Sequence, residues 1–267
     1  MASAFLYRNL FDSAVFYGDT GTTALSSLPL SNLRDPQPRV RARWVPASCA
    51  LWIDLGSVQA VSCVALISTS LGLAGGSPTV RARVSTDAGF ATSAWDTGAI
   101  DPATSDAANG NVVLLHATSA SGRFVRIDVA DPAADALDIG RIVIGPLWRL
   151  THGQALGFGE GRQILDRRER NAHTGAEFPV PAVVNPRQAT FTLPFVTPTE
   201  ATAQWRTMLA TLGGVQDALW VPSDSLSLAE TNLRSIWGAA VQPGESALIT
   251  RPYHTALTRS FTLVERA

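Results

Sequence analysis

The chain of 267 residues contains no lysine, because all 21 of its basic residues are arginine. This absence excludes Walker-type phosphate binding, Schiff-base chemistry and a lysine general base. The arginine bias, beside abundant alanine, is interpreted first as nucleotide composition of the source genome. The formal net charge of −1 leaves no basic surplus for a phosphate backbone, so we expect no nucleic-acid partner.

Cysteine is scarce as well, since Cys49 and Cys63 are the only two in the chain. Two cysteines are too few for a disulfide scaffold or for a zinc site made of cysteine alone. We expect two buried thiols, with a bridge between them as the alternative. The four histidines are scattered without paired spacing, so the sequence predicts no metal site and no cofactor.

Long apolar runs and catalytic motifs are also missing. Arg8 and Asp12 interrupt the apolar N-terminal segment, which therefore lacks the pattern of a signal peptide or membrane span. We expect synthesis in the cytosol and no membrane insertion. There is no G-x-S-x-G motif, and the glycine-rich segment 153–161 is not followed by a lysine. We therefore expect no enzyme, with a hydrolase that uses an unusual site as the third hypothesis.

The sequence does contain short strand-like segments joined by turns, with 46% hydrophobic residues, 16 prolines and 21 glycines. In the segment 79–86 small apolar residues alternate with Arg81 and Arg83, which is typical of a strand with one solvated face. Segments rich in Gly, Pro, Asn, Asp and Ser at 70–78 and 99–111 predict loops. This pattern favours a sandwich of antiparallel strands. The same alternation recurs at 122–131, with Val125, Ile127 and Val129 opposite Arg126 and Asp128.

Glycines after residue 150 mark a boundary, so we predict a first domain over 1–150 and a second over 151–267. In the second, a strand at 188–196 leads into a helix at 198–212, with Thr197 as N-cap, Pro198 at the first position and Glu200 completing a capping box. Further strands are expected in DALWVPSDS, LRSIWGAAV and SFTLVERA. The predicted fold is mainly β, a jelly-roll sandwich followed by a smaller sheet with one packed α-helix. The helix should bury a stripe formed by Ala201, Trp205, Met208, Leu209 and Leu212.

Three segments of the first half resemble the galactose-binding-like, or discoidin, family. They are LSNLRDPQPRVRARW (30–44), LWIDLGSVQAVSCVALIS (51–68) and GRFVRIDV (122–129). The resemblance implies a jelly roll. Many members of the family carry Asp-Gly-Asn in the early loop beside a calcium ion, whereas here Asp35 is followed by Pro36 and Gln37. This departure puts a bound calcium in doubt.

The combination of both halves is similar to a group of bacteriophage tail proteins. The segments that correspond are IVIGPLWRL, ILDRRERNAHTG, FTLPFVTPTEATAQWRTMLATLGG, LWVPSDS and FTLVERA. The resemblance implies a structural component of a tail tip or baseplate, located in the virion and made in the host cytoplasm. Its partners would be other tail proteins, and it would form a homo-oligomer or ring. Within DRRER, Arg167, Arg168 and Arg170 are candidates for a salt-bridged interface, or for a solvated strand face.

A second functional hypothesis places a ligand at the rim of the jelly roll. Arg43, Trp44 and Trp95 lie in or beside predicted rim loops, where stacking and bidentate hydrogen bonds hold sugars in this family. Tryptophans of this kind are more often packing residues. The alternative to the tail protein is therefore a carbohydrate-binding module that recognises a cell-surface glycan.

Overall fold

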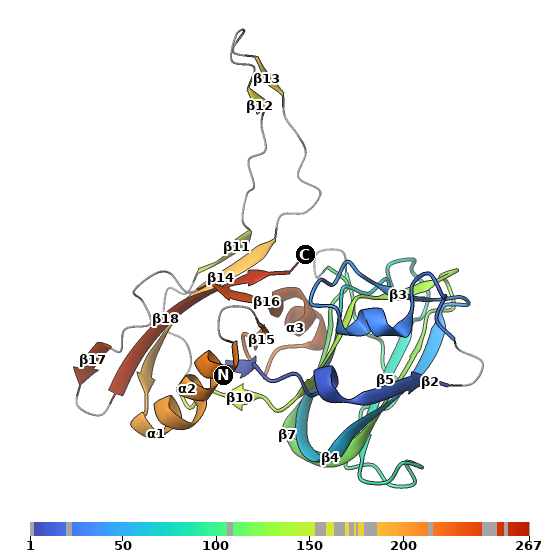
Figure 1. The fold of residues 1–267 in the computed structure, drawn as a ribbon, viewed down its shortest axis with the longest axis horizontal. Coiled ribbons are helices and arrows are strands. Elements are labelled where there is room, and N and C mark those ends of the chain that lie inside the picture. Colours follow the sequence, from blue (N-terminus) through green and yellow to red (C-terminus); the bar gives the residue numbers. More distant parts are fainter. Residues whose placement is uncertain are drawn as a thin grey trace.

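The computed structural model describes residues 3–19, 23–105, 109–152, 159–162, 169–170, 174, 176–178, 186–212, 216–241, 250–253 and 256–266. It contains two β-rich bodies side by side, a sandwich and a second sheet that carries helices (Figure 1). The mainly β fold predicted from the alternating segments is confirmed.

The first body is a β-sandwich. Two long strands, β4 (Ser48–Ile67) and β7 (Val112–Ala130), run through both layers, and their pairing shifts register between Asp54 and Gln59. The first half of β4 also pairs with β2 (Val15–Gly18), and its second half pairs with β9 (Arg141–Gly145). Next to β7 lie β5 (Thr79–Ser85) and β6 (Trp95–Asp96). The predicted inward face of β5 is confirmed, because Val80, Ala82 and Val84 are fully buried.

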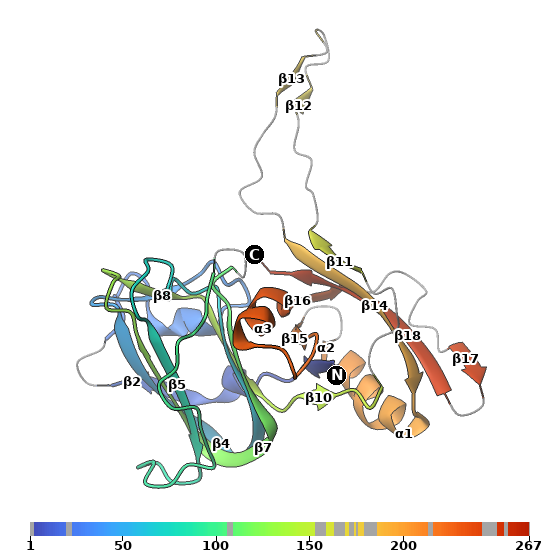
Figure 2. The same ribbon diagram turned by 180° about the vertical axis from the view of Figure 1, so that it is seen from behind.

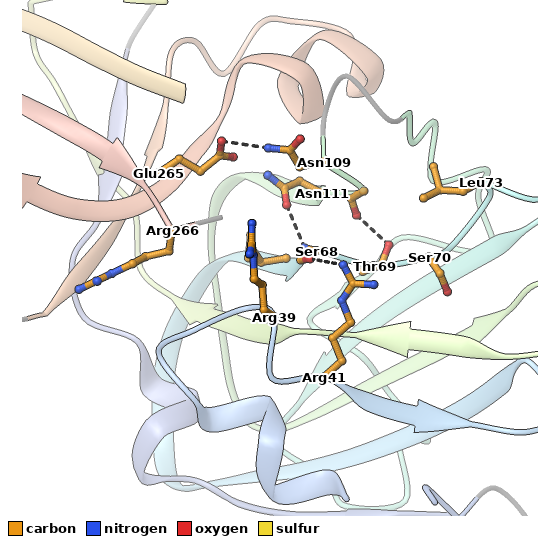
Figure 3. A pocket seen from close by; sticks show the side chains of 12 residues that line it. Arg39, Arg41, Ser68, Thr69, Ser70, Leu73, Asn109, Asn111, Glu265 and Arg266 are labelled. Carbon is orange, nitrogen blue, oxygen red and sulfur yellow. Dashed lines mark hydrogen bonds between the residues drawn. The ribbon is translucent and has the colours of Figure 1, made fainter. Parts of the chain in front are cut away.

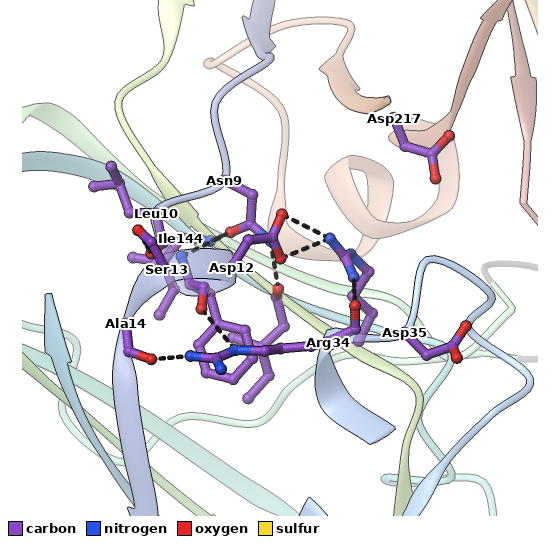
Figure 4. Close-up of polar contacts among 12 residues, drawn as sticks. Asn9, Leu10, Asp12, Ser13, Ala14, Arg34, Asp35, Ile144 and Asp217 are labelled. Carbon is purple, nitrogen blue, oxygen red and sulfur yellow. Dashed lines mark hydrogen bonds and ion pairs between the residues drawn. The ribbon is translucent and has the colours of Figure 1, made fainter. Parts of the chain in front are cut away.

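Short elements close one side of the sandwich. Strand β3 (Ala42–Trp44) pairs with β8 (Leu137–Ile139), and two 3-10 helices, η1 (Leu10–Ser13) and η2 (Leu30–Arg34), pack nearby. Figure 4 shows the polar contacts that fix them. Arg141 donates to both carboxylate oxygens of Asp12 at 2.8 and 2.9 Å, and the Asn9 amide donates to the Ile142 carbonyl at 3.0 Å. These bonds tie the N-terminal segment to β9.

The second body is an eight-stranded antiparallel sheet. The two bodies do not follow the predicted division of the chain at residue 150. Strand β1 (Ala4–Leu6) lies inside this second sheet, between β10 (Trp148–Arg149) and β15 (Asp217–Val221). The chain therefore begins in the second body, builds the sandwich and returns. Beyond β15 follow β16 (Ile236–Val241), β18 (Ala256–Glu265), β14 (Arg187–Val196) and β11 (Gly159–Arg162), with β17 (Thr250–Tyr253) paired to β18.

A shared core joins the two bodies. Side chains of β1, β15 and β16 pack against the back of the sandwich, so each body buries part of the other's apolar surface. The predicted pair of buried thiols is confirmed, since Cys49 and Cys63 are both buried and free. Burial raises the pKa of Cys63 to about 12. The shared cluster comprises Ala4, Leu6, Cys63, Ala65, Ile67, Val113, Val143, Leu219, Val221 and Trp237.

The predicted helix is present as α1 (Pro198–Glu200), a π-helical segment (Ala201–Trp205) and α2 (Arg206–Leu212). Thr197 is its N-cap, as predicted, and its hydroxyl accepts a hydrogen bond from the Glu200 amide at 3.2 Å. The Glu200 carboxylate was expected to complete a capping box. It instead accepts hydrogen bonds from Trp148 Nε1 at 3.1 Å and from the Thr151 amide at 3.2 Å. It fastens the helix to β10. The expected apolar stripe is confirmed, with Ala201, Trp205, Met208 and Leu212 buried and Leu209 partly buried.

A further helix, α3 (Leu228–Arg234), was not predicted, and it extends into the first two residues of the segment LRSIWGAAV, which was expected to be a strand. Ser227 and Glu230 form a complete capping box, which explains why the helix begins there. The strand begins only at Ile236. The fully buried Asn232 accepts from the Val113 amide at 2.8 Å and donates to the Pro102 carbonyl at 2.7 Å. Helix α3 therefore docks on the sandwich.

Strands β12 (Glu169–Arg170) and β13 (Glu177–Phe178) pair only with each other among the described strands. Figures 1 and 2 draw these two strands away from both bodies. The candidate interface residue Arg170 lies in β12, whereas Arg167 and Arg168 fall outside the described residues. Among described residues, no helix combines the length and the apolar character needed to span a membrane.

Candidate functional site

A pocket of about 260 Å³ lies at the end of the sandwich where its loops meet the end of β18 (Figure 3). One wall comes from the segment before β3 and from the loop after β4, and another from the residues that precede β7. The last wall comes from the second body. The residues that line it with polar side chains include Arg39, Arg41, Ser68, Asn111, Glu265 and Arg266.

Close packing of two loops shapes the floor of the pocket. Gly110 has φ +68°, and a Cβ atom there would lie 2.0 Å from the Thr69 carbonyl oxygen, so only glycine permits this approach. Thr69 donates from its hydroxyl to the Gly110 carbonyl at 2.7 Å. Ser68 and Asn109 also have positive φ values, 57° and 54°, although neither is glycine. Such unfavourable conformations persist where surrounding contacts hold them, and they cluster at binding sites.

Asn111 is the most deeply placed polar group of the pocket, with 1% of its surface exposed. Its Oδ1 accepts a hydrogen bond from the Ser68 amide at 3.0 Å. Its Nδ2 has no hydrogen-bond partner among the described residues, and Figure 3 shows this nitrogen on the side of the amide away from Ser68. This nitrogen is not fully buried, so it can donate to a ligand in the pocket that offers an acceptor.

Two arginines face this donor. Arg39 is exposed and has neither a hydrogen bond nor an ion pair within the described structure, and its side chain rises into the pocket in Figure 3. Arg41 donates to the Ser68 hydroxyl at 3.0 Å and lies 3.7 Å from Asp138. The same carboxylate is held more closely by Arg43, at 2.6 and 2.7 Å. The positive charge of Arg41 is therefore only weakly compensated.

The acidic groups of the opposite wall are already engaged. Glu265 accepts from Arg187 Nε at 2.9 Å, from the Arg187 amide at 3.0 Å and from Asn109 at 2.9 Å. Arg266 donates to Asp217 at 3.0 Å. Burial raises the pKa of Asp217, and this ion pair opposes the shift. The free polar groups that face the pocket are thus mainly donors.

The predicted sugar-binding residues lie elsewhere. Trp44 and Trp95 are 1% and 6% exposed and belong to the core of the sandwich, which corrects the expectation of rings open to a sugar. Trp44 is buried because it alternates with Arg43 along β3, and it pairs with Leu137. Arg43 is partly exposed, and its bond to Asp138 raises its pKa. Asp138 also pairs with Arg41, which lines the pocket, so Arg43 is connected to the pocket by this shared ion pair.

Sequence reasoning missed Arg39 and Arg41. The signal in the sequence was the cluster of three arginines in RVRAR, of which Arg39 lies in the turn before β3 and Arg41 directly precedes the strand. Asn111 could not be recognised in the same way, because its role depends on contact with the distant Ser68.

Exposed aromatic rings lie on the outer face of the sandwich, away from the pocket residues. Tyr17 on the edge strand β2 is 56% exposed and lies parallel to Trp52, with ring centroids 6.4 Å apart. The Arg126 guanidinium lies 4.6 Å from the Trp52 centroid on the neighbouring strand. This row, defined as the Tyr17 face, is the alternative surface for a stacked ligand.

The described residues contain no group of three or more His, Cys, Asp and Glu side chains that could hold a metal ion. Asp35, in the early loop that bears calcium in many discoidin-like proteins, accepts a hydrogen bond from the Gln37 amide at 2.8 Å. It stabilises its own turn.

No protein-family model matches the chain, and no curated protein matches it. Among solved structures it is similar to CpGH89CBM32-6 from Clostridium perfringens, with 21% identity over 51% of this chain and 98% of that one, at a TM-score of 0.37. A CBM32 module from a family 31 glycoside hydrolase of Clostridium perfringens gives 14% identity over 52% and 99%, at 0.42. A fucose-binding module of Streptococcus pneumoniae gives 11% over 52% and 98%, at 0.39. These identities and TM-scores give no evidence about the ligand or the partner of this chain.

Proposed function

We propose that the chain is a non-catalytic binding protein that holds a saccharide in the pocket between the sandwich loops and the end of β18. The observation that carries this function is the convergence of donors that lack partners or full compensation, from Arg39, Arg41 and Asn111. Planar guanidinium and amide groups suit the hydroxyl and ring oxygens of a sugar. The half-exposed Leu73 adds an apolar contact at the edge.

The size and composition of the pocket favour binding over turnover. Its volume of about 260 Å³ lies below the roughly 300–1,000 Å³ of pockets for drug-sized ligands, which suits one sugar ring. Glycoside hydrolysis needs two carboxyl groups across the scissile bond. Glu265 is the one carboxylate among the lining residues, and it is bound to Arg187.

A glycan array followed by calorimetry on the best saccharide tests this function. We expect Arg39→Ala and Arg41→Ala to weaken binding at least tenfold without changing the unfolding temperature, because both side chains are exposed or partly exposed. Arg206→Ala is the matched control, since Arg206 is an exposed arginine on α2. The function is excluded if the protein binds no saccharide, or if both pocket variants bind as tightly as the wild type.

A second candidate function is assembly into a larger particle, which the resemblance to phage tail proteins implies. What favours it is the isolated β12–β13 pair. A two-stranded sheet is marginally stable by itself in water, so a partner surface would supply the missing packing. The location in a virion, the tail partners and the ring are predictions. The two functions are compatible in one protein.

The segment between β11 and β14, which contains β12 and β13, can be deleted without interrupting either flanking strand. Arg162 on β11 and Arg187 on β14 are paired, so residues 163–186 can be replaced by the two-residue turn Asn-Gly. We expect the shortened protein to keep the unfolding temperature and saccharide affinity of the wild type and to lose its oligomeric state in light scattering. A full-length protein that is strictly monomeric, and absent from virions by mass spectrometry, would exclude assembly.

A further inference from the structure

We infer that the saccharide bound in this pocket carries an anionic group, a carboxylate or a sulfate ester. This inference deepens the proposed function and rests on it. It follows from the charge balance of the pocket, from the geometry of its free donors and from the position of its acidic groups.

The pocket has more positive charge than its own carboxylates neutralise. Counting the lining residues and every member of the ion-pair networks to which they belong, which includes Arg43 as the second partner of Asp138, there are five arginines and three carboxylates, a surplus of two positive charges. Two of the carboxylates are each committed to one arginine, and the third is shared. The arginines are Arg39, Arg41, Arg43, Arg187 and Arg266, and the carboxylates are Asp138, Asp217 and Glu265.

The surplus is concentrated where a ligand can reach it. Arg187 and Glu265 neutralise each other with side chains only 6% and 3% exposed. Asp138 is held in a bidentate bond by Arg43, so Arg41 receives little compensation at 3.7 Å. Arg39 receives none from the described residues. The weakly compensated guanidinium group of Arg41 and the unpaired one of Arg39 therefore both border the pocket.

The free donors match an anion better than a neutral sugar. A guanidinium group presents a planar fork of N–H donors that pairs with two oxygens of one carboxylate or sulfate. The Nδ2 of Asn111, which has no partner among the described residues, adds a neutral donor at the floor. A neutral saccharide would satisfy single donors and leave the charge surplus in place. An anionic substituent satisfies the donors and neutralises charge in the same contact.

The test compares matched saccharides that differ in one group. Calorimetry should be run with a sialylated glycan, its desialylated parent, and a sulfated form of that parent, at low and at high salt. We expect at least one acidic form to bind tenfold or more tightly than the neutral parent, with an advantage that shrinks as salt rises. Arg39→Gln should lower affinity for the acidic form by a larger factor than affinity for the neutral form, and Arg206→Gln should change neither.

The outcomes separate the two conclusions. Equal affinity for acidic and neutral forms overturns the anionic ligand and leaves saccharide binding intact. Binding of no saccharide at all overturns both. Inorganic sulfate that binds as tightly as the acidic glycan also overturns the inference, because the sugar would then contribute nothing. Thermal unfolding of each variant beside the wild type excludes misfolding, which is not expected for the exposed Arg39.

Discussion

The ion pair between Arg187 and Glu265 gives the sharpest prediction about stability. Both side chains are almost fully buried, at 6% and 3% exposed, and the pair holds the end of β18 against the start of β14. We consider Arg187→Met, which removes the guanidinium group and keeps an unbranched apolar side chain. The Glu265 carboxylate would then keep only the Asn109 amide and the residue 187 backbone amide as donors.

The expected cost follows from the burial of the remaining charge. Breaking a buried ion pair by removing one partner destabilises a protein by about 3–5 kcal/mol, because the other charge stays desolvated. Arg187 also donates to the Leu233 carbonyl, and this hydrogen bond would be lost as well. We therefore expect the decrease in the free energy of unfolding to lie in the upper half of that range. Against a typical total stability of about 5–15 kcal/mol, the variant should be markedly less stable than the wild type.

Urea unfolding followed by tryptophan fluorescence measures this difference. The matched variant is Arg187→Met combined with Glu265→Gln, which removes the uncompensated charge. We expect the double variant to recover at least about 2 kcal/mol relative to Arg187→Met, a coupling typical of directly interacting groups. A single variant that loses less than about 1 kcal/mol, or a double variant that recovers nothing, would refute the burial argument.

Three further predictions follow from single residues. Trp44→Ala should destabilise the protein by about 3–5 kcal/mol in urea unfolding, because the ring is 1% exposed; a near-neutral effect would contradict its place in the core. Gly110→Ala should weaken saccharide binding and lower the unfolding temperature, because its Cβ would meet the Thr69 carbonyl oxygen at 2.0 Å; unchanged binding in calorimetry would contradict the loop geometry. The hydrogen bond from Arg123 lowers the pKa of Asp54 to about 2, from about 3.9 in the unfolded chain. The ionised Asp54 therefore stabilises the folded protein fully at a pH above the unfolded-chain pKa, and this stabilisation is lost as the pH falls through 2. The difference in unfolding temperature between wild type and Asp54→Asn should shrink between pH 5 and pH 2 in calorimetry, and a constant difference would disprove it.

Local patterns in the sequence predicted the parts of the fold that local physics decides. Alternation along β5 specified its buried face, since a strand has a period of two. Thr197 and Pro198 marked the start of the helix, because capping depends on neighbouring residues alone. The capping box at Ser227 is the same kind of local signal for α3, although the sequence prediction contained no helix there.

Long-range arrangements could not be predicted in this way. The three residues of β1 carry no sign that they pair with β15, more than two hundred positions later. The pocket depends on the same kind of contact, since Glu265 meets Asn109 across 156 positions. Trp44 was placed wrongly because composition cannot tell a rim tryptophan from a core one. Arg41, three positions before it, lines the pocket instead.

A crystal structure of the protein with the tightest acidic saccharide from the array tests the central claim most directly. Our account predicts the sugar between the loops at Ser68 and Asn111 and the end of β18, with its anionic group at Arg39 and Arg41. A saccharide seated instead on the Tyr17 face would contradict it.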